Sequence, residues 1–170
     1  MKIKRAELFQ ASSPLMFQAK TKDLSLDDLD VISDTFPVEL NVDRAGSDLN
    51  VKGQVVVNLR ETCDRCLTPF DMPMEVTFQL LLTEKESLLS GEQVTDIHLF
   101  PVSQHEFDFG PTIRDAILLE RSMKHICRED CKGLCPRCGT NLNVKACNCE
   151  KDEIDERWAP LKELSSFKTE

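Results

Sequence analysis

Eight cysteines constrain this chain of 170 residues more than any other feature, because four of them fall within fifteen residues. That segment begins Cys135-Pro-Arg-Cys138-Gly and closes with Cys147-Asn-Cys149. A Cys-x-x-Cys turn brings two thiolates to one point, and a tetrahedral zinc site needs two such pairs. The spacing of Cys135, Cys138, Cys147 and Cys149 therefore predicts a closed structural zinc site with no open position for water.

The other four cysteines form two further pairs, Cys63-Asp-Arg-Cys66 and Cys127-Arg-Glu-Asp-Cys131. The first pair closes a predicted β-hairpin, and the second lies at the end of a predicted helix, where residues four apart share a face. We expect the two pairs to meet and share a second zinc ion. Three alternatives stay open: Cys63 and Cys66 form a redox pair, Cys131 joins the first site, or His125 replaces a cysteine.

Composition favours a protein of the reducing cytoplasm. Hydrophobic residues make up 41% of the chain and charged residues 30%, which is usual for a globular protein. The sequence contains neither a run of roughly 20 apolar residues nor the apolar core of a signal peptide. In a reducing compartment clustered cysteines favour metal ligation over disulfides. We therefore expect a cytoplasmic protein that does not enter a membrane.

Charge is distributed unevenly along the chain. The formal net charge is −9, yet residues 120–149 contain six basic and three acidic side chains, a local balance of +3. An acidic body argues against a protein that coats nucleic acid by charge alone. The candidate contacts for RNA phosphate or an acidic partner are Arg65, Arg128, Lys132, Arg137 and Lys145. The alternative is that these side chains only offset thiolate charge.

Hydrophobic periodicity predicts an α+β fold, with a mainly antiparallel β-sheet or partly open barrel, one main helix and a zinc-stabilised C-terminal arm. Strands are expected at 3–9, 14–19, 36–42, 49–59 and 74–82, with shorter extended segments at 94–100 and 106–109. A helix is expected at about 111–126, with Ile113, Ala116, Leu119, Met123 and Ile126 packed on the sheet. The expected division is a β-rich body over 1–126, a zinc arm over 127–150 and an amphipathic tail over 151–170.

Catalytic motifs are not found in the sequence. Its three histidines lie outside any His-Glu-x-x-His pattern, and neither a phosphate-binding glycine loop nor a Gly-x-Ser-x-Gly elbow occurs. We therefore expect a protein that is not an enzyme and has no small-molecule substrate.

Two segments resemble one known family. The sequence from Leu59 to Phe70 contains Cys63-Asp-Arg-Cys66-Leu-Thr-Pro, and residues 131–143 read Cys-Lys-Gly-Leu-Cys-Pro-Arg-Cys-Gly-Thr-Asn-Leu-Asn. Both are similar to signature segments of the YceD family, also called DUF177, and the likeness extends over about 35–165. The resemblance implies a bacterial or plastid factor needed for large-subunit ribosomal RNA to accumulate.

The expected function is therefore non-catalytic. The resemblance implies a factor in large ribosomal subunit biogenesis that supports 23S rRNA accumulation or processing by binding rRNA, a ribosomal protein, or both. Some members of the family lack the second of these segments, which suggests that the hairpin cysteines are the older element. The alternatives are a thiol-based redox or metal sensor and a zinc-ribbon regulatory module.

Overall fold

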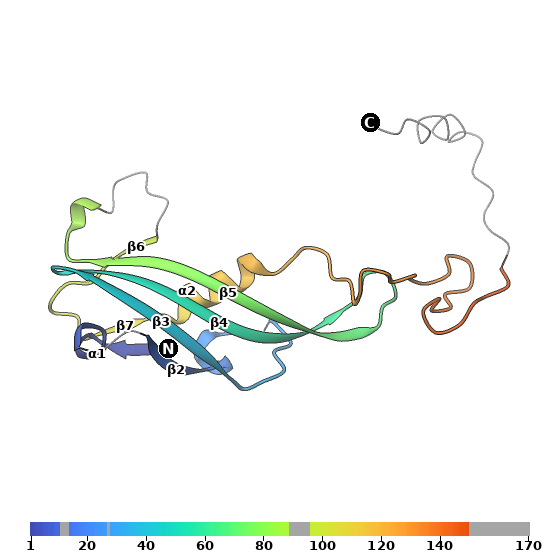
Figure 1. Ribbon diagram of the computed structural model, residues 1–170, viewed down its shortest axis with the longest axis horizontal. Helices are drawn as coiled ribbons and strands as arrows, with labels where there is room; N and C mark the ends of the chain where they lie inside the picture. Colours follow the sequence, from blue (N-terminus) through green and yellow to red (C-terminus); the bar gives the residue numbers. More distant parts are fainter. Residues whose placement is uncertain (11–13, 27, 89–95, 150–170) are drawn as a thin grey trace, which may run out of the picture.

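The computed structural model describes residues 1–10, 14–26, 28–88 and 96–149, and its body is a five-stranded sheet in the order β2-β3-β4-β5-β6 (Figure 1). These strands are β2 (Leu15–Lys20), β3 (Thr35–Ala45), β4 (Asp48–Thr62), β5 (Pro69–Thr83) and β6 (Asp96–Leu99). A second sheet pairs β1 (Lys2–Lys4) with β7 (Glu106–Asp108). The helical elements are α1 (Arg5–Gln10), η1 (Thr21–Leu24), η2 (Glu86–Leu88) and α2 (Gly110–Glu120).

The sheet confirms the expected α+β class. Every strand pair in it is antiparallel except β5–β6, which is parallel, and the strand order leaves the sheet open rather than closed into a barrel. Along β4 alternate residues are buried, as a strand with one covered face requires. Among the described residues, no helix is long and apolar enough to cross a membrane.

The β4–β5 hairpin extends beyond the strands beside it. Residues 49–62 pair with 69–82 without a break, whereas β3 pairs with β4 only as far as Val55. Beyond that point the N–H of Arg60 donates to the carbonyl of Asp30 at 2.8 Å, so a loop flanks β4 there. The tip of the hairpin therefore projects from the body and meets the segment that follows α2 (Figure 1).

Helix α2 is shorter than the expected 111–126, and a different face of it is buried. Ile113 and Ile117 are fully buried, whereas Leu119 is 86% exposed and Met123 entirely exposed. At about 100° per residue, Ile117 lies about 40° from Ile113 around the helix axis and Leu119 about 120° away. The expectation that Leu119 and Met123 pack on the sheet was wrong, because Leu119 lies off the buried face of α2 and Met123 lies beyond the end of the helix at Glu120.

The N-terminal segment also differs from the expected strand at 3–9. Only β1 is extended, and the chain then forms α1, whose Leu8 is fully buried. Residues 6–8, Ala-Glu-Leu, are strong helix formers, and that local preference combines with burial of Leu8 to outweigh strand pairing. Strand β2, close to the expected 14–19, pairs with β3. The expected tail at 151–170 lies outside the described residues.

Gly53 allows a close approach between the two long strands. It lies directly opposite Phe78 in the β4–β5 register, and a Cβ atom at residue 53 would come within 2.1 Å of the Phe78 ring. We predict that Gly53→Ala displaces this ring and lowers the free energy of unfolding by about 1–3 kcal/mol, measured by chemical denaturation.

The double variant Gly53→Ala/Phe78→Ala is the control for this prediction. Removing the ring should relieve the clash, so the two changes together should cost less than the sum of the two single costs. Strict additivity of the two costs would contradict the proposed contact.

Candidate metal centres

Four cysteines meet at the tip of the β4–β5 hairpin, and we call them the proximal tetrad: Cys63, Cys66, Cys127 and Cys131. Their sulfur atoms all lie within 4.8 Å of one another, with Cys63 Sγ 3.8 Å from Cys131 Sγ and Cys66 Sγ 3.7 Å from Cys127 Sγ. Tetrahedral zinc–thiolate bonds place neighbouring sulfurs about 3.8 Å apart. The arrangement therefore fits one tetrahedral metal ion. Ile126, from the expected stripe, packs against this group.

The remaining four cysteines gather farther along the chain, and we call them the distal tetrad: Cys135, Cys138, Cys147 and Cys149. Their sulfur atoms also all lie within 4.8 Å of one another. Among the described residues, Cys131 belongs to the proximal group alone, and neither group of potential ligands includes His125. The structure thus brings together the two sets of four cysteines that spacing suggested, although residues 127–131 form a turn rather than a helix end.

The two Cys-x-x-Cys units are the same backbone turn. In the hairpin, Leu67 N–H donates to Cys63 O at 2.8 Å and Cys63 N–H donates to Thr68 O at 3.0 Å. The corresponding bonds in the distal turn are Gly139 N–H to Cys135 O at 2.9 Å and Cys135 N–H to Thr140 O at 2.8 Å. A threonine hydroxyl lies 3.5 Å from Cys66 Sγ and 3.2 Å from Cys138 Sγ, where it can donate to a thiolate. The shared pattern Cys-x-Arg-Cys-x-Thr therefore encodes one backbone turn, used twice.

One position of this turn needs a left-handed backbone. Gly139 occupies it in the distal turn with φ of 68°, and Leu67 occupies it in the hairpin with φ of 55°. A left-handed leucine is strained, and here its side chain is 62% exposed, so apolar burial contributes little to offset the strain. The closure of the hairpin around the cysteines therefore holds Leu67 in place.

The cysteine-rich arm, residues 127–149, is bonded directly to the hairpin tip. Arg65 Nη1 donates to the carbonyls of Glu129 and Cys131 at 3.3 and 3.2 Å, and the Arg65 carbonyl accepts from Leu134 N–H at 3.0 Å. Arg65 was expected either to contact a partner or to offset thiolate charge. In the structure its guanidinium contacts the arm, although the residue as a whole is exposed.

Two asparagines link the arm to both the hairpin and a cysteine sulfur. Asn143 Nδ2 donates to Cys131 Sγ at 3.4 Å, and Asn143 Oδ1 accepts from Lys132 N–H at 2.8 Å. Asn141 Nδ2 donates to the Thr68 hydroxyl at 3.1 Å. These residues were not predicted from the sequence, although the repeated threonine and the Asn-Leu-Asn spacing were available signals.

A partly buried ion pair joins the end of α2 to the hairpin just before Cys63. Glu61, only 9% exposed, accepts from Arg121 Nε at 2.7 Å and from Arg121 Nη2 at 3.0 Å. His125 Nε2 lies 3.7 Å from the same carboxylate, and His125 N–H donates to Asp64 Oδ2 at 2.7 Å. The Arg121 guanidinium holds the pKa of Glu61 below its usual value. The ion pair therefore directs the chain from the helix to the proximal tetrad.

Thiol acidity is divided within each tetrad. The backbone at Cys127 lowers the pKa of Cys63 to about 6, and the Thr140 hydroxyl lowers that of Cys138 to about 6. Burial raises the pKa of Cys127 to about 12, and the hydrogen bond with Cys138 raises that of Cys149 to about 12. Four adjacent thiols cannot all lose their protons without a compensating positive charge. A divalent metal ion supplies that charge.

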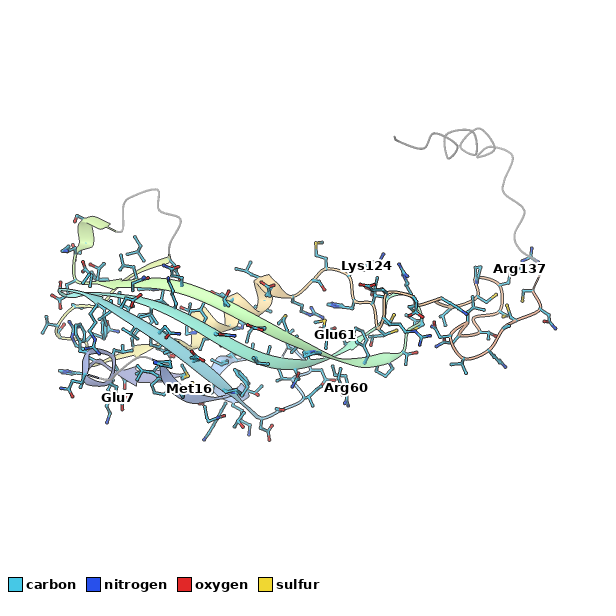
Figure 2. The ribbon with its side chains drawn as sticks, viewed as in Figure 1. Glu7, Met16, Arg60, Glu61, Lys124 and Arg137 are labelled. Carbon is cyan, nitrogen blue, oxygen red and sulfur yellow. The ribbon has the colours of Figure 1, made fainter. Side chains whose placement is uncertain are left out.

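The other candidate contact residues lie along the arm. Arg128 is half exposed and pairs with Asp130 at 3.2 Å. Lys132, Arg137 and Lys145 are exposed, and Arg137 lies at the outer end of the arm, far from the body (Figure 2).

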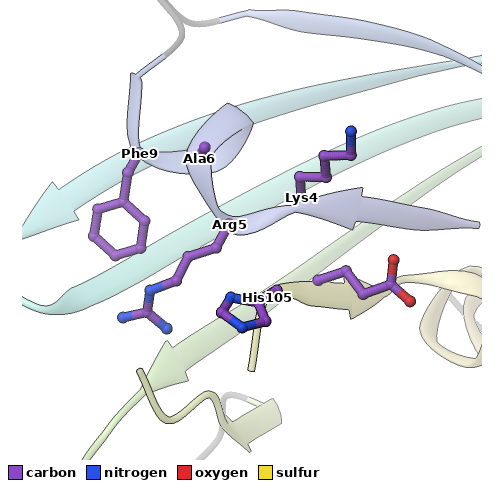
Figure 3. A pocket seen from close by; sticks show the side chains of 6 residues that line it. Lys4, Arg5, Ala6, Phe9 and His105 are labelled. Carbon is purple, nitrogen blue, oxygen red and sulfur yellow. The ribbon is translucent and has the colours of Figure 1, made fainter. Parts of the chain in front are cut away.

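A surface pocket of about 580 Å³ lies beside α1 (Figure 3), at the end of the molecule opposite the arm (Figure 1). Arg5 lies at its wall, but its guanidinium donates to the carbonyls of Phe100 and Pro101, pairs with Glu84 and stacks over the ring of Phe9. These contacts give Arg5 a structural role in the pocket.

Taken together, fold and sites define a class of protein: an open antiparallel sheet whose longest hairpin carries a cysteine-rich arm that could hold two metal ions. The chain belongs to the YceD family, described as large ribosomal RNA subunit accumulation protein, whose profile matches residues 51–165.

Curated relatives come from plants and mycobacteria. A chloroplastic YCED homolog 1 of Arabidopsis thaliana, named a large ribosomal RNA subunit accumulation protein, is 30% identical over 77% of this chain and 49% of its own length. A maize protein of the same name is 30% identical over 74% and 52%, and an uncharacterized protein of Mycobacterium tuberculosis H37Rv is 31% identical over 75% and 60%. The chain thus spans about half to three fifths of the length of these relatives. No solved structure matches it.

We predict that Glu61→Ala lowers the free energy of unfolding by about 1–3 kcal/mol, because it leaves Arg121 without its carboxylate. The Arg121 side chain is 37% exposed, so the loss of stability should be smaller than for a fully buried ion pair. The matched control is Asp71→Ala, which removes the exposed Arg60–Asp71 pair and should cost less than about 1 kcal/mol. Equal costs in chemical denaturation would contradict a special role for Glu61.

We further predict that Gly133→Ala loosens the arm from the hairpin. Gly133 has φ of 72°, and a Cβ atom there would lie 2.9 Å from the Arg65 carbonyl oxygen. The strain should amount to about 1–3 kcal/mol and should raise amide hydrogen exchange in the arm while leaving β3 and β4 protected. Unchanged exchange in the arm would show that this contact is unimportant.

Proposed function

We propose that both tetrads hold zinc and that the zinc is structural. Four thiolates form a soft, closed ligand set, which suits zinc and leaves no position for a reacting water molecule. The proposed ligands are Cys63, Cys66, Cys127 and Cys131 at the proximal site and Cys135, Cys138, Cys147 and Cys149 at the distal site. The sulfur spacing of the proximal tetrad supports this assignment.

On this proposal the arm is a metal-ordered unit. The body over 1–126 buries a large apolar core, whereas the buried residues of the described arm are cysteines and one glycine. Metal binding therefore takes the place that a hydrophobic core has in the body, and binding of zinc contributes directly to ordering residues 127–150. The tail over 151–170 is proposed as a separate unit.

We predict two zinc ions per chain by native mass spectrometry, with one lost in Cys66→Ser and one in Cys138→Ser. Cys138→Ser should raise amide exchange within 135–149 while the sheet keeps its protection. Zinc content should fall as pH is lowered, because protons compete with the metal for thiolates. The control is Lys145→Ala, which changes an exposed residue between distal ligands and should retain both ions. Metal-free protein with a protected arm would refute the assignment.

The proposed cellular role is non-catalytic. The chain acts in large ribosomal subunit biogenesis and supports 23S rRNA accumulation or processing, in the cytoplasm and without a small-molecule substrate. Membership of the YceD family carries this proposal, since the family is described by large ribosomal RNA subunit accumulation. The closed ligand sets are consistent with it, because they offer rigidity rather than reactivity.

The arm is the proposed surface for rRNA or a ribosomal protein. Its candidate contacts are Arg65, Arg128, Lys132, Arg137 and Lys145. Residues 120–149 carry +3 before metal binding, and each zinc tetrathiolate centre adds about −2. Binding must therefore come from individual side chains that reach phosphates, not from the net charge of the arm.

Crosslinking to ribosomal precursors, followed by sequencing of the attached RNA, tests this function. We expect enrichment of large-subunit rRNA, and random recovery would overturn the proposal. The charge reversal Lys132→Glu/Lys145→Glu should weaken crosslinking. It should also reduce the slope of the logarithm of the RNA-binding constant against the logarithm of salt concentration by about one for each lost phosphate contact. The matched control is Lys20→Glu/Lys52→Glu, which reverses two exposed lysines of the body and should leave crosslinking unchanged.

A further inference from the structure

The two tetrads differ in their exposure to solvent. In the proximal tetrad Cys63, Cys66 and Cys131 are at most 5% exposed. In the distal tetrad Cys135 is buried but Cys138 is exposed. An attacking reagent therefore reaches the exposed Cys138 without any opening of the fold, whereas in the proximal tetrad Cys63, Cys66 and Cys131 are shielded and Cys127 is half-buried.

The tetrads also differ in how the chain holds their ligands. The proximal ligands come from two segments about sixty residues apart, and the hairpin ladder, the Glu61–Arg121 pair and the Arg65 contacts fix those segments. The distal ligands all come from residues 135–149. Among the bonds described there, Lys145 N–H to Asn141 O at 3.2 Å is the last backbone contact before Cys147. Separating the distal ligands therefore needs only local opening of the arm, which has a low free-energy cost.

We propose that the distal tetrad is an oxidation site: peroxide converts two of its thiolates to a disulfide and releases its zinc, while the proximal tetrad keeps its metal. The two sites have the same ligand type and the same Cys-x-Arg-Cys-x-Thr turn. The difference in reactivity consequently comes from exposure and anchoring, not from ligand chemistry.

The reaction balances with peroxide as the oxidant. One thiolate attacks the peroxide O–O bond, which breaks to give a sulfenic acid and, with one proton, water. A second thiolate attacks that sulfur, the S–S bond forms, and a second water leaves with another proton. Two thiolates lose two electrons in total and hydrogen peroxide gains them. The zinc ion, left with two thiolate ligands, departs to solvent.

Oxidation would act on one part of the arm only. Arg137 and Lys145 lie between distal ligands, whereas Arg65 lies in the hairpin tip, where its carbonyl accepts from Leu134 N–H, and Lys132 directly follows the proximal cysteine Cys131. Loss of the distal zinc would release the first pair and leave the second in place. This inference rests on the proposed zinc occupancy but not on the proposed rRNA role.

The test follows zinc release from the full-length zinc-loaded protein with a chromogenic chelator after addition of hydrogen peroxide. We expect one zinc ion to leave at least about tenfold faster than the other, because one site needs only local opening. Cys138→Ser, which keeps only the proximal ion, should lack the fast phase. Cys66→Ser, which keeps only the distal ion, should lack the slow phase.

Mass-spectrometric mapping of the wild type makes the result independent of whether either variant folds. After brief oxidation and alkylation, the disulfide should lie within residues 135–149, with Cys63, Cys66 and Cys131 still reduced. Equal release rates, or first oxidation at the proximal tetrad, would overturn the inference while leaving zinc occupancy intact. Purified protein that contains no zinc would instead refute the occupancy on which the inference rests.

Discussion

The convergence of four sulfur atoms at the end of the β4–β5 hairpin is the constraint on which the arm depends. The hairpin pairs continuously to the turn that carries Cys63 and Cys66, and the ion pair between Glu61 and Arg121 directs the chain from α2 to the same point. Hydrogen bonds from Arg65 then attach the arm to the tip. Because the described arm has few buried apolar side chains, its order depends on these polar contacts and, on the proposal above, on the zinc held by its cysteines.

The same Cys-x-Arg-Cys-x-Thr turn appears in two settings. Its backbone hydrogen bonds and threonine contacts are equivalent in the hairpin and in the distal arm. In the hairpin a sheet supports the turn strongly enough to hold Leu67 in a left-handed conformation that Gly139 adopts without strain in the arm. Identical ligand chemistry can thus give sites of different stability, because the surrounding structure sets the cost of opening each one.

An elongated shape follows from this arrangement. The body buries its apolar core at one end, and the arm with its basic side chains extends beyond the hairpin at the other (Figure 1). For a proposed assembly factor this separation is useful, because the exposed residues of the arm can reach a partner without opening the core. The acidic charge of the remainder would oppose nonspecific spreading along RNA.

Local patterns were enough to predict much of this protein. Alternation of apolar residues located β3, β4 and β5, and the Cys-x-x-Cys spacing together with the predicted hairpin grouped the cysteines into the two tetrads that the structure brings together. Both features are short-range, because a strand or a tight turn is specified by neighbouring residues. The end of α2 was not predictable in this way, since it depends on Arg121 reaching Glu61, 60 residues earlier in the chain.

The sequence by itself therefore determined the central strands β3, β4 and β5, the two Cys-x-Arg-Cys-x-Thr turns and the family. Only the tertiary structure decided that β6 runs parallel to β5, that Arg65 bonds to the arm, and that three proximal cysteines are buried while Cys138 is exposed. The physical reason is that burial and anchoring depend on which distant segments meet. Residue spacing alone does not show which distant segments are in contact, even where it identifies the candidate ligands.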